Sequence, residues 1–83
     1  MYGGYYVTMI REGKKPALIA GPYETFKEAD RVGPMAKAAV LKHHPENHSE
    51  GDEWGVALFQ FHRRVDGQYN DELWVKPFDR AWN

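Results

Sequence analysis

The stretch "GPYETFKEADRVGPMAKAAVLKHHP", residues 21–45, decides the fold because its apolar residues recur at helical spacing. Thr25 followed by Glu28 forms a capping box, in which each side chain satisfies a free backbone N–H at the helix start. Pro45 disfavours helical backbone for the residue before it, so we expect the helix to end at 43–44. One face of this helix carries Phe26, Ala29, Val32 or Gly33, Ala36, Val40 and His43.

The pair Gly33-Pro34 conflicts with that helix. A proline inside a helix loses a hydrogen bond, and its ring clashes with the preceding turn. We therefore expect either a kink at this point or two short helices, with Pro34 opening the second.

Two short segments before the helix predict a hairpin. Residues 5–11, "YYVTMIR", are β-branched and aromatic, as in strands. "EGKK" supplies a glycine for a tight turn, and "PALIAG" follows as a second strand. Pro16 cannot donate a ladder hydrogen bond, so we expect it at the start of that strand or on an edge.

Residues 54–64, "WGVALFQFHRR", are the strongest strand candidate in the chain. The segment is apolar on both faces through its middle, which predicts a central place in the sheet. Asp66-Gly67 is a pair typical of tight turns, and "YNDELWV" after it reads as a short strand or an irregular return. Val56, Leu58, Gln60 and His62 share one face, and Ala57, Phe59 and Phe61 share the other.

The chain therefore predicts an α+β domain in β-β-α-β order: a small antiparallel sheet of three to four strands with one kinked helix packed on it. Its 83 residues make a single domain, 1–83, with an aromatic C-terminal segment at 73–83.

Composition narrows the functional classes. The net charge of −1 argues against a dedicated nucleic-acid binder, which normally carries a basic excess. No apolar run approaches the roughly 18 residues that span a bilayer, and the N-terminal residues do not form a secretory signal. The absence of cysteine excludes disulfides and thiolate chemistry. We expect a cytoplasmic protein that does not bind membranes.

The sequence offers little for catalysis. The hydroxyl nucleophiles are Ser49, Thr8 and Thr25, and the two threonines already have places in a strand and a helix cap. No glycine elbow surrounds Ser49, and no phosphate-cradling loop is present. We expect a protein that is not an enzyme and needs no cofactor.

The histidines of "HHPENH" are the best metal candidates. His43, His44 and His48 lie close together in sequence, and Glu46, Glu50, Asp52 and Glu53 follow as further ligands. Pro45 breaks the helix that would align His44 with His48, and histidine at a helix C-terminus has an ordinary electrostatic role. We expect a solvated loop and no metal.

The aromatic segment at 73–83 is the first candidate partner surface. Trp74, Phe78 and Trp82 recur every four residues, the spacing of one helical face. Pro77 suits the first turn of a short helix there. The stripe either folds back over the open face of the sheet or forms an exposed anchor for another protein or a second copy.

Two charged patches are the other candidates. Acidic residues at 46–53 and in later loops either occupy a basic groove of a partner or keep the loops soluble. Basic residues lie around the first turn and at 63–64. They are either solvent-exposed charges at strand ends, or they form with Tyr5 or Tyr6 a platform for single-stranded nucleic acid. The acidic residues are Glu46, Glu50, Asp52, Glu53, Asp66, Asp71 and Glu72; the basic ones are Arg11, Lys14, Lys15, Arg63 and Arg64.

The segments "YYVT" and "LIAGPYETFKEAD" resemble short proteins carried by bacterial phages and plasmids. The resemblance covers about residues 5–32 and transfers no functional residues. It implies a mobile-element origin, and small phage proteins of this size often inhibit host defence complexes, anti-CRISPR proteins among them.

The sequence thus predicts a protein-binding module whose partner is a host protein or complex, with homodimerisation as a further use of the same surfaces. Nucleic-acid binding through Arg11, Lys14, Lys15, Arg63 and Arg64 is the alternative. The predicted contact residues are Trp74, Phe78, Trp82, Glu50, Asp52 and Glu53.

Overall fold

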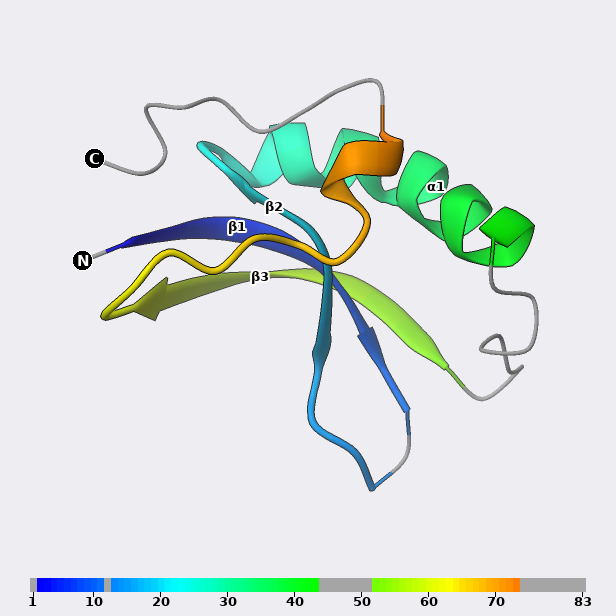
Figure 1. The fold of residues 1–83 in the computed structure, drawn as a ribbon, viewed down its shortest axis with the longest axis horizontal. Helices are drawn as coiled ribbons and strands as arrows, with labels where there is room; N and C mark the ends of the chain where they lie inside the picture. The colour runs from blue at the N-terminus through cyan, green and yellow to red at the C-terminus, as the bar shows by residue number, and fades with distance from the viewer. Residues whose placement is uncertain (1, 12, 44–51, 74–83) are drawn as a thin grey trace.

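The computed structural model describes residues 2–11, 13–43 and 52–73. The strands β1 (Tyr2–Ile10), β2 (Ala17–Tyr23) and β3 (Glu53–Phe61) form one antiparallel sheet in the order β2-β1-β3. Helix α1 (Phe26–His43) lies across one face of the sheet, and a short 3-10 turn, η2 (Asn70–Glu72), follows β3 (Figure 1). The predicted α+β class and β-β-α-β order are confirmed.

Helix α1 begins with one of the two hydrogen bonds of the predicted capping box; within the described chain, no bond joins the Thr25 N–H to the Glu28 carboxylate. The Thr25 Oγ1 accepts a hydrogen bond from the Glu28 N–H at 3.1 Å. The buried face carries Ala29, Val32, Ala36 and Val40, whereas Phe26 and His43 at the two ends are exposed. The four buried residues form a core with side chains of β1 and β2, which holds the helix on the sheet.

The Gly33-Pro34 pair does not divide the helix. Helix α1 continues as one element of 18 residues with Pro34 inside it, so the expectation of two short helices is wrong. A residue before proline avoids helical backbone mainly because its Cβ meets the proline ring. Gly33 has no Cβ, which explains how the helix passes through this position.

Strand β1, not β3, is the central strand of the sheet. The expectation that residues 54–64 form the central strand is therefore wrong. The two faces of β3 are apolar for separate reasons. Trp54 and Val56 pack against the core beneath α1. On the opposite face, the rings of Phe59 and Phe61 contact the Tyr6 ring edge-on, at 5.9 and 6.0 Å between centroids.

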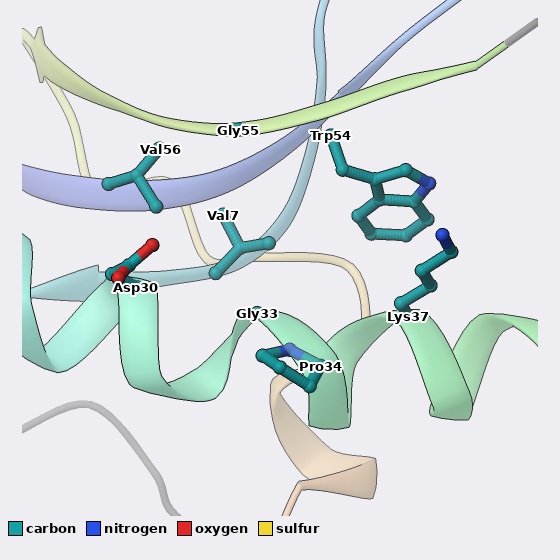
Figure 2. A pocket seen from close by; sticks show the side chains of 8 residues that line it. All are labelled: Val7, Asp30, Gly33, Pro34, Lys37, Trp54, Gly55 and Val56. Atoms are coloured by element: carbon teal, nitrogen blue, oxygen red, sulfur yellow. The ribbon is translucent and has the colours of Figure 1, made fainter.

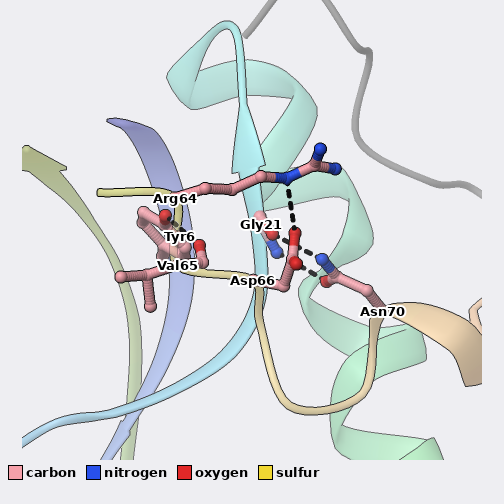
Figure 3. Close-up of polar contacts among 6 residues, drawn as sticks. All are labelled: Tyr6, Gly21, Arg64, Val65, Asp66 and Asn70. Atoms are coloured by element: carbon pink, nitrogen blue, oxygen red, sulfur yellow. Dashed lines mark hydrogen bonds and ion pairs between the residues drawn. The ribbon is translucent and has the colours of Figure 1, made fainter. Parts of the chain in front are cut away.

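After β3 the chain returns across the face of the sheet opposite α1. Tyr6 is fully buried there, and its hydroxyl donates a 2.6 Å hydrogen bond to the Val65 carbonyl (Figure 3). The N–H groups of Gln68 and Tyr69 then donate to carbonyls of β2, at 2.9 and 2.8 Å. Residues 62–69 are thus an irregular return. The segment 69–75, expected as a short strand or an irregular return, contains the 3-10 turn η2 and no strand over its described residues 69–73; residues 74–75 lie outside the described ranges.

Gly67 has a different role from the tight turn that Asp66-Gly67 predicts. A Cβ at Gly67 would meet the Cα of Ala20 at 2.5 Å. The return segment therefore approaches β2 closely enough to require glycine. Asp66 instead lies at the surface beside Arg64, with 3.5 Å between its Oδ1 and the arginine Nε (Figure 3).

Asn70 fixes the end of the return segment to β2. Its Nδ2 donates to the Gly21 carbonyl at 2.5 Å, and its Oδ1 accepts from the Gly21 N–H at 2.9 Å (Figure 3). Gly21 has a φ of 137° and precedes Pro22 through a cis peptide bond. That φ suits glycine alone. The pairing places Tyr69 and Leu73 in the core under α1.

Candidate functional site

The outer edge of β3 is one of the two edges of the sheet. Strand β3 has nine residues and lies at the end of the strand order. The other edge strand, β2, receives backbone hydrogen bonds from residues 67–69. Within the described ranges, no segment pairs with the outer edge of β3. Its outward N–H and C=O groups therefore have no backbone partner in the described part of the chain, and such groups pair readily with another strand.

An exposed leucine marks the middle of this edge. Leu58 is 56% exposed, the largest value among the exposed large hydrophobic residues of the described chain. It lies on the same face of the sheet as Trp54 and Val56, because side chains alternate along a strand. The β3 edge therefore combines unpaired backbone with an apolar side chain at its centre.

A groove of about 450 Å³ lies between β3 and α1. Figure 2 shows Val7, Trp54 and Val56 on the sheet side, and Asp30, Pro34 and Lys37 on the helix side. Gly33 and Gly55 complete the lining. The groove is mostly apolar with one charge of each sign at its rim.

Gly33 keeps the groove open on the helix side. No atom of another element lies within 4 Å of the position where its Cβ would stand. Pro34 next to it has no N–H, so the Asp30 carbonyl lacks its helical donor. The Gly33-Pro34 pair, which the sequence marks as unfavourable for a helix, thus forms a notch in α1 that faces β3.

Two hydrogen-bond donors meet at one end of the groove. The Trp54 Nε1 is buried and has no partner among the described residues. In Figure 2 the Lys37 side chain extends toward this indole. Lysine and tryptophan nitrogens only donate, so neither satisfies the other. The carboxylate of Asp30, an acceptor, lies farther along the groove.

The predicted acidic surface is only partly present in the described chain. Asp52 is not a solvated carboxylate, because its side chain is 0% exposed and binds Arg11 through two hydrogen bonds of 2.9 and 3.1 Å. That hydrogen bond raises the pKa of Arg11. Glu53 is exposed at the start of β3. Glu50, Trp74, Phe78 and Trp82 lie outside the described residues.

The predicted basic surface is divided between the two ends of the sheet. Strand β1 pairs with β3 from Tyr2↔Phe61 to Ile10↔Glu53. Arg11, Lys14 and Lys15 therefore lie at one end, whereas Arg63 and Arg64 lie at the other. The expectation that these groups come together is wrong, since the antiparallel register separates them by the length of β1.

The two tyrosines expected in the nucleic-acid platform, Tyr5 and Tyr6, do not lie together on one exposed surface. Tyr6 is buried beneath the return segment. Tyr5 faces α1, where its ring lies edge-on to Phe26 at 6.1 Å. The aromatic residues on the face opposite α1 are instead Tyr2, Phe59 and Phe61, with the two phenylalanine rings stacked at 6.0 Å. Alternation along the strands was the sequence feature that could have identified them.

No protein-family model matches the chain, and neither a curated protein nor a solved structure matches it. No helix in the described part of the chain is long and apolar enough to cross a membrane. Among the same residues, no group of three histidines or carboxylates is placed to hold a metal ion; His44 and His48 lie outside them.

Proposed function

We propose that this protein is a binding module that takes an extended segment of another protein onto the outer edge of β3. The observation that carries the proposal is the unpaired nine-residue edge, which no other described segment covers. An added strand gains main-chain hydrogen bonds along such an edge, and alternate side chains provide specificity. No covalent bond is made or broken in this activity.

The groove beside β3 supplies the specificity. Side chains of an added strand alternate between the two faces, so every second one points toward the face that carries Leu58 and the groove. An apolar residue there covers Leu58, which is 56% exposed. A neighbouring polar residue with an acceptor meets the donors of Lys37 and Trp54. We expect a partner segment that alternates in this way.

The resemblance of residues 5–32 to phage and plasmid proteins supports a host defence complex as the natural source of that segment. This narrower proposal concerns the partner's identity and not the surface that binds it. The surface follows from β3 alone.

The test is an affinity capture from bacterial lysate with three baits: wild type, Leu58→Lys and Leu41→Lys. Leu41 is an exposed helix residue, at 39%, and serves as the matched control. We expect one protein to be enriched by wild type and Leu41→Lys and lost with Leu58→Lys. Equal capture by both variants would place binding elsewhere and overturn the proposal.

A second measurement locates the contact directly. Hydrogen–deuterium exchange of the complex should slow the amides of residues 53–61, because an added strand protects the outward N–H groups of β3. Amides of β1 are already within the sheet and should change little. Protection confined to α1 would contradict strand addition.

Nucleic-acid binding is a second candidate, favoured by the stacked rings of Phe59 and Phe61 and by Arg63, an exposed residue two positions after Phe61. Single-stranded nucleic acid stacks its bases on such rings. Binding of this kind weakens steeply with salt and needs Arg63. Titration of a labelled oligonucleotide at two salt concentrations decides between the candidates, since strand addition depends on Leu58 instead.

A further inference from the structure

We infer that, in the free protein, the β3 edge is occupied by a second copy of this chain, paired antiparallel through β3 with Leu58 on the two-fold axis. This inference rests on the proposed function, because both use the same edge. A long, uncovered edge strand promotes uncontrolled pairing with other chains. A self-complementary edge limits that pairing to one closed dimer.

The charges along β3 favour the antiparallel arrangement. Glu53 is at the start of the strand and Arg63 lies just past its end; both are exposed, and neither forms an ion pair with a described residue. Leu58 is midway between them. Pairing about Leu58 therefore brings Glu53 toward Arg63 of the second copy, which lies in the bend directly after β3, twice in the dimer. A parallel pairing would place like charges together, which is unfavourable.

On the face opposite α1, the same register places large residues opposite small ones. Gly55 comes to lie opposite Phe61 of the second copy, and Ala57 opposite Phe59 of the second copy. Gly55 is exposed, and only the Thr8 Oγ1, at 3.9 Å, lies within 4 Å of its Cβ position. Aromatic rings opposite edge glycines stabilise strand pairs.

On the face that carries α1, Leu58 meets its own copy. Its exposed surface is removed from water by an identical residue, which is the contact that a two-fold axis provides. The sheet of the dimer then has six strands, with β3 and its copy at the centre and the two helices on the same face.

The helices leave room for this arrangement. Helix α1 packs over all three strands of its own sheet. In the dimer, β1 and its copy are three strand spacings apart, about 14 Å. Helices pack at about 8–10 Å between axes, so the two copies of α1 do not collide.

The test uses charge reversal and sedimentation velocity over a range of protein concentrations at low ionic strength. We expect wild type to be a reversible dimer. Glu53→Arg and Arg63→Glu should each weaken the dimer by about tenfold or more, because two attractive pairs become repulsive ones. The doubly reversed chain should recover wild-type association.

Mixing the two single variants gives the sharpest result. Each heterodimer then contains two opposite-charge pairs, so the mixture should associate more tightly than either variant alone. Circular dichroism of each variant confirms that the fold is retained. Leu41→Lys, away from the edge, should leave the dimer unchanged.

Two outcomes would overturn the inference. One is a wild-type monomer at every concentration. If Leu58→Lys still abolishes capture of a partner in that case, the β3 edge binds another protein, as proposed, but not a second copy of this chain. The other is a dimer that neither Leu58→Lys nor the charge reversals weaken, which would place the dimer contact away from β3. If Leu58→Lys also captures the partner as well as wild type does, the proposed function is wrong too, independently of the dimer.

Discussion

Tyr6 joins the two halves of the chain at the level of a single residue. Its ring is fully buried in β1, and its hydroxyl reaches the Val65 carbonyl in the return segment. Burial, and next the charge of Asp66, raise the pKa of Tyr6 to about 12. The hydroxyl therefore keeps its proton, and its role as donor, to a higher pH than an exposed tyrosine does.

Replacing Tyr6 with Phe should lower the free energy of unfolding by about 1 kcal/mol, because the Val65 carbonyl loses its donor while the ring packing is kept. Urea denaturation followed by circular dichroism measures this change. Tyr5→Phe is the control, since the Tyr5 hydroxyl has no hydrogen bond within the described chain. Equal losses in the two variants would show that the Val65 contact contributes nothing.

At the level of elements, α1 retains a residue that weakens it. Pro34 lies inside the helix and is exposed at the groove, so no packing in the core requires it. Proline costs a helix interior about 3 kcal/mol relative to alanine. Residues that serve binding often lower the stability of the fold, so a destabilising proline that lines a candidate site is consistent with a role in binding.

Pro34→Ala should raise the free energy of unfolding by about 1–2 kcal/mol, because the Asp30 carbonyl regains a helical donor and the ring clash is removed. Thermal and urea denaturation measure the gain. Arg31→Ala, at another exposed helix position, should change stability by only a few tenths. A loss of stability in Pro34→Ala would mean that the proline makes contacts that its exposure does not reveal.

Local rules predicted the elements better than their arrangement. The capped start of α1 and its buried face follow from spacing within a few residues, so the sequence was sufficient for them. The place of β3 depends on where residues 62–73 go, and that path is set by distant contacts such as Tyr6 with Val65 and Asn70 with Gly21. The sequence showed that Gly33-Pro34 conflicts with a helix. It could not predict the groove, because the groove forms only where β3 lies opposite that pair.

At the level of the whole molecule, two buried tyrosines link stability to alkaline pH. Tyr23 resembles Tyr6 in that burial, and next the charge of Glu28, raise its pKa to about 12. An unfolded tyrosine loses its proton near pH 10. Between about pH 10 and 12 the unfolded state therefore binds fewer protons than the folded state, and stability falls as pH rises.

We expect the free energy of unfolding to fall above pH 10 by the order of 1 kcal/mol per pH unit for each tyrosine. Urea denaturation at several alkaline pH values measures the slope, and Tyr6→Phe should reduce it. Phenolate absorbance should show that Tyr6 and Tyr23 ionise together with unfolding. A slope unaffected by Tyr6→Phe would assign the pH dependence to other groups.

The central position of β1 also has a consequence for synthesis on the ribosome. Strand β1 is synthesised before the other two described strands, yet its surroundings are completed last, because β3 pairs with it and Val65 lies 59 residues after Tyr6. A nascent chain that stops before the return segment leaves both sides of that strand unfinished. The sheet therefore cannot be completed until the return segment has been synthesised, and until then the unpaired strands and exposed apolar surface of the β1–β2 hairpin are prone to aggregation.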